Sequence, residues 1–294
     1  MNAIRTLAKR NAKLFLRDRS TLFFSFLSSL ILLALYFLFI AKIYAQEMEA
    51  LALPFSAAGA NFIIYLQMMA GVLILNSMSL ATGAFSTIAK DFENKRTDCF
   101  LLAPIRAWEL AAAYFCNALA VSFGLNTLTW SATFALIGAL TGYWLSAATF
   151  FSALAVLFFA SLISCSIMLL VTSLVKSSAA IGVIAGISGT FFGFLCGIYM
   201  PYNNLGEGTK AAGSLLPLSH LTIWLKRLVL RDAFAQLELP AARADDLLLD
   251  YFSAESIGFC TLPAPLWLML LLSGLLGAAC LLAARVVLGK RMNR

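Results

Sequence analysis

Charged side chains are scarce in this chain, making up 12% of its 294 residues, whereas 62% of the residues are hydrophobic. A soluble globular domain carries roughly twice that share of charge. A chain of this length has too little interior to hide so much apolar surface, so part of that surface faces lipid. The composition therefore excludes a soluble enzyme, a disordered regulator and a nucleic-acid-binding module. In a membrane protein, the net charge of +7 indicates topology rather than a nucleic-acid partner.

Several kinds of reactive site are missing as well. The chain has one histidine, His220, and its six cysteines lie almost entirely within apolar runs, with no C-x-x-C spacing. This pattern predicts buried cysteines rather than a metal centre or a disulfide framework. No segment matches the phosphate-binding pattern G-x-x-x-x-G-K-[ST]. If ATP drives this protein, a partner hydrolyses it.

Long uncharged runs are what the chain has in excess, and the longest covers the 66 residues 110–175. Because about 20 residues cross a hydrocarbon core of about 30 Å, this run folds back on itself, at the glycines and aromatics of 138–146. The runs are continuously apolar rather than alternating, which excludes a strand barrel. We predict an all-α integral membrane protein with six transmembrane helices, at about 21–43, 62–89, 110–138, 145–174, 177–200 and 257–284.

The lysines and arginines predict the orientation of these helices. Fifteen of them lie in the N-terminal segment, the loop after the second helix, the segment after the fourth and the C-terminal tail, and six lie on the other side. The basic excess belongs in the cytoplasm, so both termini are expected inside.

The two largest segments outside the predicted spans each contain a candidate interfacial helix. In residues 1–20, the basic residues Arg5, Lys9, Lys13 and Arg17 recur every four positions, which predicts either an amphipathic helix on the inner leaflet or only a positive-inside anchor. Residues 201–255 form an expected external loop. Its helix, over 219–236, would cap the bundle, with leucines and a tryptophan on one side and Lys226, Arg227 and Arg231 elsewhere.

Two of the predicted spans contain residues that contact with lipid does not require, namely small polar side chains in one and a row of glycines in the other. The second span has a mildly polar stretch, whose side chains either form hydrogen bonds between helices or line a pathway. The fifth has glycines on one face, suited to packing within one bundle, to a dimer seam or to a substrate-lining face. The polar residues are Asn76, Ser77, Ser79 and Thr82, and the glycines are Gly182, Gly186, Gly193 and Gly197.

Two other mechanisms are disfavoured by the residues of the spans. Residues 186–189 read GISG, which resembles the nucleophile motif of rhomboid-type intramembrane proteases. A serine nucleophile needs a base within hydrogen-bond reach, and His220 is expected in a polar loop. The spans hold essentially no ionisable residue between their ends, so transport through a carboxylate relay also loses support.

The loop after the second span mixes four basic and four acidic residues over 90–110, followed by an apolar edge and Pro104. Its first part looks helical, and Pro104 ends it. A short amphipathic helix of this kind docks into a groove of a partner protein, or it is only a solvated turn.

The order of these features resembles the permease subunit of the type-2 ABC exporters, a family that includes drug, polysaccharide and lipid export permeases. Four stretches carry the resemblance: LFLRDRSTLFFSFL at 14–27, KRTDCFLLAP at 95–104, GIYMP at 197–201 and LLPLSHLTIWLKRLVL at 215–230. Together with the six-helix layout they cover most of the chain.

The resemblance implies one permease domain over 1–294, with 1–20 as the connecting helix, 90–105 as the coupling loop on a separate ATP-binding subunit, and 201–255 as the outer gate and cap. Two permeases and two ATPases would form a transporter in the cell membrane, in contact with lipid and not with nucleic acid. ATP and Mg would be bound by the partner subunit, and this chain would hold no catalytic residue and no metal ligand.

The resemblance also assigns roles to individual residues. The coupling residues would be Lys90, Asp91, Glu93, Lys95, Arg96, Thr97, Phe100 and Leu101. The substrate pathway would be lined by Asn76, Ser77, Thr82, Ser188, Thr190 and Phe191, and the packing or dimer seam would be formed by Gly182, Gly186, Gly193 and Gly197. The alternative is a membrane-embedded assembly or regulatory factor that has no transport cycle of its own.

Overall fold

The computed structural model describes residues 2–20, 23, 27, 31, 56–94, 107–175, 177–198, 205–252 and 266–292. No strand occurs in these ranges, so the predicted all-α class is confirmed for this part of the chain. The helices in chain order are α1 (Asn2–Arg17), α4 (Ala57–Glu93), α6 (Ala107–Thr141), α7 (Ala147–Leu174), α8 (Ser178–Leu195), α9 (Glu207–Ser214), α10 (Pro217–Gln236), α11 (Ala241–Asp246), the π-helical turn η3 (Leu247–Tyr251) and α12 (Leu266–Met292).

Three helices of the described part are long and apolar enough to cross a membrane, namely α4, α6 and α7. They cover the second, third and fourth predicted spans. The shorter α8 and the helix α12 overlap the fifth and sixth, whereas 21–43 lies outside the described residues apart from positions 23, 27 and 31. The count of six spans and their orientation stay predictions.

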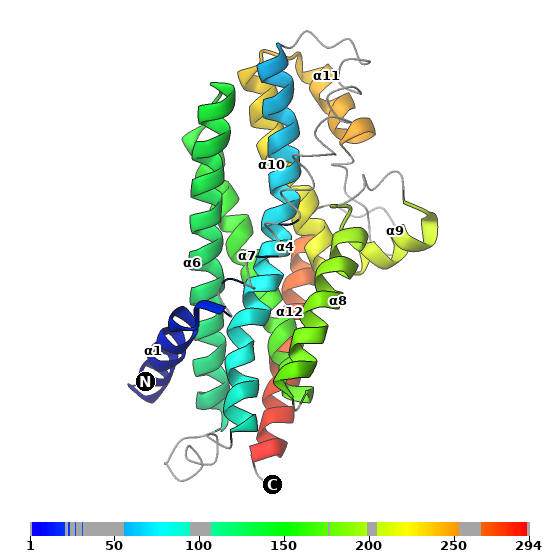
Figure 1. Ribbon diagram of the computed structural model, residues 1–294. Helices are drawn as coiled ribbons and strands as arrows, with labels where there is room; N and C mark the ends of the chain where they lie inside the picture. Colours follow the sequence, from blue (N-terminus) through cyan, green and yellow to red (C-terminus); the bar gives the residue numbers. More distant parts are fainter. Residues whose placement is uncertain are drawn as a thin grey trace.

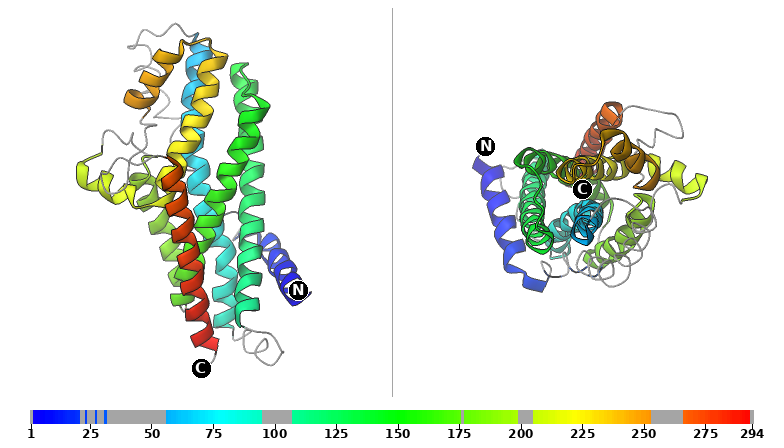
Figure 2. Two further views of the ribbon diagram at one scale, coloured as in Figure 1. Left: turned by 180° about the vertical axis from the view of Figure 1, so that it is seen from behind. Right: turned by 90° about the horizontal axis from the view of Figure 1, so that it is seen from above.

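The long helices form one bundle (Figure 1). α4, α6 and α7 run along its length, α8 and α12 lie beside its lower part, and α10 lies beside the upper part of α4. The helix α1 lies at the outer edge of the bundle against α6, as both views in Figure 2 show. The marked N- and C-termini both lie in the lower half of Figure 1, the arrangement that the predicted orientation requires.

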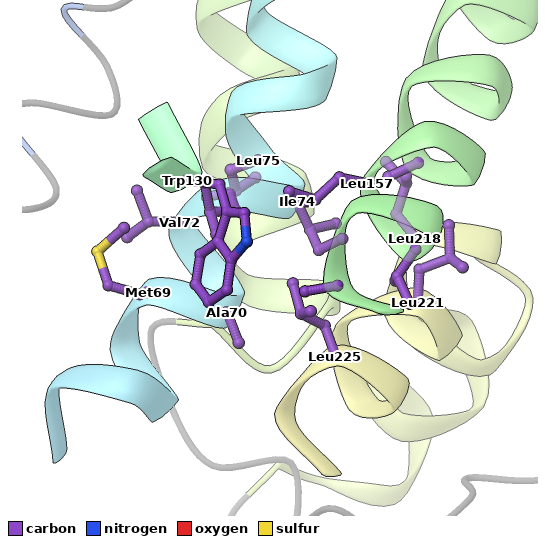
Figure 3. Close-up of a cluster of buried hydrophobic side chains, with 14 of the residues drawn as sticks. Met69, Ala70, Val72, Ile74, Leu75, Trp130, Leu157, Leu218, Leu221 and Leu225 are labelled. Atoms are coloured by element: carbon purple, nitrogen blue, oxygen red, sulfur yellow. The ribbon is translucent and has the colours of Figure 1, made fainter. Parts of the chain in front are cut away.

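The core is built around α4. In the most apolar 18-residue stretch of α4, 78% of the residues are buried within the chain, whereas in the corresponding stretch of α6 only 28% are buried. A helix that is apolar all round and surrounded by other helices buries every face. Figure 3 shows this cluster, in which Ile74 and Leu75 of α4 lie among Trp130 of α6, Leu157 of α7 and Leu221 of α10. α4 is therefore the most buried of the three long apolar helices of the described part.

The predicted fold-back at 138–146 is confirmed by the turn between α6 and α7. Gly142 has a φ of +78°, which favours glycine, and Ser146 caps α7 by accepting a hydrogen bond from the backbone N–H of Thr149. The carboxylate of Asp232 on α10 accepts a hydrogen bond of 2.7 Å from the Ser146 backbone N–H. The turn is therefore tied to the segment that was expected to form the cap.

The predicted helix over 219–236 is confirmed as α10, but two of its residues, predicted to be in polar surroundings, are buried. His220 is buried within the helix rather than placed in a polar loop. Lys226 is 5% exposed, and its Nζ donates a hydrogen bond of 3.1 Å to the Gly197 carbonyl oxygen. α10 packs against both α4 and α7, which buries the side chains of His220 and Lys226. The Gly197 carbonyl group, just after the end of α8, supplies a hydrogen-bond acceptor that this buried ammonium needs.

Candidate functional site

A buried carboxylate joins α1, α4 and α6 at the lower end of the bundle. Asp91, near the end of α4, is 2% exposed. The guanidinium of Arg10 donates to both of its oxygens, with Nη1–Oδ2 at 2.7 Å and Nη2–Oδ1 at 3.1 Å. The hydroxyl of Tyr114 on α6 donates to Oδ2 at 2.8 Å. We call these three residues the Asp91 clamp.

The chemistry of the clamp explains its geometry. A buried carboxylate is costly unless it is paired and hydrogen-bonded. A planar guanidinium that contacts both carboxylate oxygens is one of the strongest and most directional partners available. The hydrogen bond to Asp91 accordingly raises the pKa of the Arg10 guanidinium above its ordinary value. The clamp therefore fixes both the position and the orientation of α1 on the bundle.

A second ion pair lies close to the clamp. The ammonium of Lys90 donates to the carboxylate of Asp18, just after α1, at 2.8 Å. Both side chains are substantially exposed, so this pair contributes little to stability. It nevertheless makes a second contact between the segment after α1 and the end of α4.

The structure divides the predicted coupling residues. Asp91 is buried in contacts within the chain, Lys90 is exposed and paired with Asp18, and Glu93 is exposed. The others, Lys95, Arg96, Thr97, Phe100 and Leu101, lie outside the described residues.

Arg10 and Tyr114 were not among the predicted site residues. On a helix, Arg10 lies on the same side as Lys13 and Arg17, so its position in the sequence does not distinguish it from the other basic residues of α1. Nothing in the local sequence of Tyr114 marks its role either.

A layer of small polar side chains joins α4, α6 and α7 halfway along the bundle. The Asn76 amide donates to Asn126 Oδ1 at 3.1 Å, and the Asn126 amide donates to the Leu73 carbonyl oxygen at 3.1 Å. The hydroxyls of Ser77 and Ser164 are 3.0 Å apart. Of the two roles left open for Asn76 and Ser77, the described contacts are hydrogen bonds between helices. Their assignment to a substrate pathway stays a prediction.

The remaining pathway residues have simpler surroundings. The hydroxyl of Thr82 is buried and donates to the Met78 carbonyl oxygen of its own helix at 2.8 Å. Phe191 on α8 is 54% exposed. Ser188 and Thr190 also belong to α8, but their side chains lie outside the described part.

The four glycines of the predicted packing or dimer seam fall into two pairs, although their spacing predicts one common face. Gly193 and Gly197 are buried, and Gly197, with a φ of +64°, ends the helix. Gly182 and Gly186 are exposed, and a Cβ added at either position would meet nothing within 4 Å in the described part of the chain. The first pair packs inside the chain, and the second leaves room for a neighbour.

The single histidine of the chain contacts the backbone. The imidazole Nε2 of His220 is 2.8 Å from the Ser214 carbonyl oxygen. Within the same residues, no group of three or more histidine, cysteine, aspartate or glutamate side chains could hold a metal ion.

A family model matches most of the chain. The model of the family described as "ABC-2 type transporter" matches residues 2–227, from α1 into α10. No curated protein matches the chain. The matched region includes the Asp91 clamp, the polar layer and the whole of α8.

The Asp91 clamp predicts the effect of Asp91→Asn. The amide cannot accept two charge-assisted hydrogen bonds from Arg10, so we expect the docking of α1 to weaken by about 1–3 kcal/mol. Weaker docking should appear as faster hydrogen exchange of the α1 backbone amides in the full-length protein. The control is Asp18→Asn, which removes only the exposed pair and should cost less than about 1 kcal/mol. Equal effects of the two variants would contradict the clamp.

The polar layer predicts that Asn126→Leu lowers the thermal stability of the detergent-solubilised protein. This variant removes the two hydrogen bonds of the Asn126 side chain, one to the Leu73 carbonyl oxygen and one from the Asn76 amide, at a cost of about 1–2 kcal/mol. Thr133→Val is the matched control, because the Thr133 hydroxyl donates only to carbonyl groups of its own helix. A loss for Thr133→Val as large as that for Asn126→Leu would show that the bonds between helices carry no special stability.

Proposed function

The chain belongs to the ABC-2 type transporter family, and from this premise we propose that it is the membrane-spanning subunit of an ATP-driven exporter. In this proposal a separate ATP-binding subunit docks on residues 90–105, binds ATP and Mg, and supplies the energy. The near absence of ionisable residues from the interior of the spans supports an external energy source. No residue of this chain takes part in the chemistry of hydrolysis.

The Asp91 clamp is the observation that supports the coupling role most directly. It joins three helices immediately before the charged loop, so a force on that loop reaches α1, α4 and α6 together. Asp91 then serves as a positioning residue inside the chain. Glu93, which is exposed, and the loop residues that follow it would contact the partner.

The exposed half of α8 supports the proposal of a second permease copy. Gly182 and Gly186 leave open space on this helix, and the neighbouring Val183 and Ile187 are more than half exposed. Small residues allow two helix backbones to approach closely in lipid. We therefore propose that α8 faces its counterpart in the second copy, and that the substrate pathway runs along this face near Phe191.

Coupling is tested by charge reversal in the loop. The ATP-binding subunit should co-purify with the chain, and Glu93→Lys or Arg96→Glu should lower the ATPase activity of the reconstituted complex by about fivefold or more, because a complementary contact becomes repulsive. Glu207→Lys on α9, an exposed site at a distance from the loop, should leave the activity unchanged. Full activity in both loop variants would refute coupling through residues 90–105. Substrate-stimulated ATPase activity in vesicles separates a transporter from an assembly factor.

The second copy is tested by Gly182→Leu. The added side chain meets open space within the described chain, so the fold should survive, but it would block close approach of another α8. We expect the dimeric fraction measured by light scattering or cross-linking to fall by about tenfold. Gly124→Leu on α6 is the matched control, since Gly124 is also exposed with open space at its Cβ position. An unchanged dimer in Gly182→Leu would exclude this face as the seam.

A further inference from the structure

A crevice of about 580 Å³ lies between α1 and α6, on the same side of the bundle as the Asp91 clamp. From α1 it is lined by Arg5, Ala8, Lys9 and Ala12, and from α6 by Asn117 and Ala120 among others. Because the clamp fixes α1, the crevice has a defined width and is not a chance gap between mobile elements.

The inner part of the crevice contains a polar group that the described chain does not satisfy. Asn117 is 2% exposed, and neither its Nδ2 nor its Oδ1 has a hydrogen-bond partner in the described part. Leaving both ends of a buried amide unpaired is costly, and such groups in native proteins are nearly always satisfied. An amide offers both a donor and an acceptor, so it suits a ligand that carries ester or hydroxyl oxygens.

The rim of the crevice is positively charged. Arg5 and Lys9 are exposed, and neither has an acidic partner among the described residues. The walls between this rim and Asn117 are formed by small apolar side chains, including Ala8, Ala12 and Ala120. A ligand that fits has an anionic group at one end, oxygen atoms in the middle and an apolar chain.

We propose that this crevice binds one anionic phospholipid of the leaflet on which α1 lies. The phosphate contacts Arg5 and Lys9, the glycerol ester region reaches Asn117, and an acyl chain follows the alanines. A free phosphate ion would use the rim but not the apolar walls or the buried amide. The lipid would fill the space between α1 and α6 and so support the position that the clamp gives to α1. This site is independent of the transport proposal, because the ATP-binding subunit takes no part in it.

Native mass spectrometry of the full chain in detergent, without any partner, tests the proposal. The probes are phosphatidylglycerol and phosphatidylcholine with the same acyl chains. We expect phosphatidylglycerol to bind on the order of tenfold more tightly, and Arg5→Gln with Lys9→Gln to abolish this preference. Ala120→Phe changes an exposed residue and fills the crevice, so it should reduce binding of phosphatidylglycerol while keeping all basic residues. Asn117→Leu should reduce it as well.

Lys13→Gln with Arg17→Gln is the matched control, since it removes the same charge from the same helix at positions that do not line the crevice. Its affinity for phosphatidylglycerol should stay within about twofold of the parent. An equal loss in both double variants would mean diffuse attraction to a basic helix and would overturn the site. Equal binding of the two lipids by the parent, full displacement of the lipid by inorganic phosphate, or unchanged binding in Ala120→Phe would each overturn it too. The exposed positions of Arg5, Lys9 and Ala120 keep the test free of folding defects, which size-exclusion chromatography checks.

Discussion

The contact between Arg10 and Asp91 determines the arrangement of the lower end of the bundle. An amphipathic helix alone has many equivalent positions on a membrane surface, because lipid headgroups and apolar contacts are not directional. A guanidinium that donates to both oxygens of a buried carboxylate is directional, so the Arg10–Asp91 contact allows α1 one position on the bundle. The place of α1 on α6, the width of the crevice beside it and the contact between Lys90 and Asp18 all depend on this pair.

Polar contacts have the same function higher in the bundle. In lipid, an apolar side chain gains little free energy when it moves from contact with acyl chains to contact with protein. Helix association therefore depends on close packing and hydrogen bonds. The hydrogen bonds of Asn76 and Asn126 join α4 to α6, and the hydroxyls of Ser77 and Ser164 join α4 to α7. Since both sets begin on α4, they hold that helix in a fixed rotation at the centre of the bundle.

The helices could be predicted from the sequence because charge is costly in lipid and so marks where spans end. The turn at 138–146 follows from the length of the uncharged run and from its glycines, and α10 follows from its amphipathic pattern. The partner of Asp91 could not be predicted, because Arg10 is 81 residues away and the contact depends on how α1 lies across α6. The burial of Lys226 and the division of the α8 glycines likewise depend on which helices surround them. The loop residues 95–106 and, apart from positions 23, 27 and 31, the first predicted span lie outside the described residues, so those expectations stay predictions.

The central helix connects the Asp91 clamp to the region where α8 ends. α4 carries Asp91 at its lower end and, about 30 Å along its axis, Gly71, where an added Cβ would come within 2.7 Å of Ile198 just beyond α8. A helix that is largely buried bends only at the expense of its close packing. The clamp and the close approach of Gly71 to Ile198 therefore lie on one closely packed element, and the position of each depends on how α4 is held in the bundle.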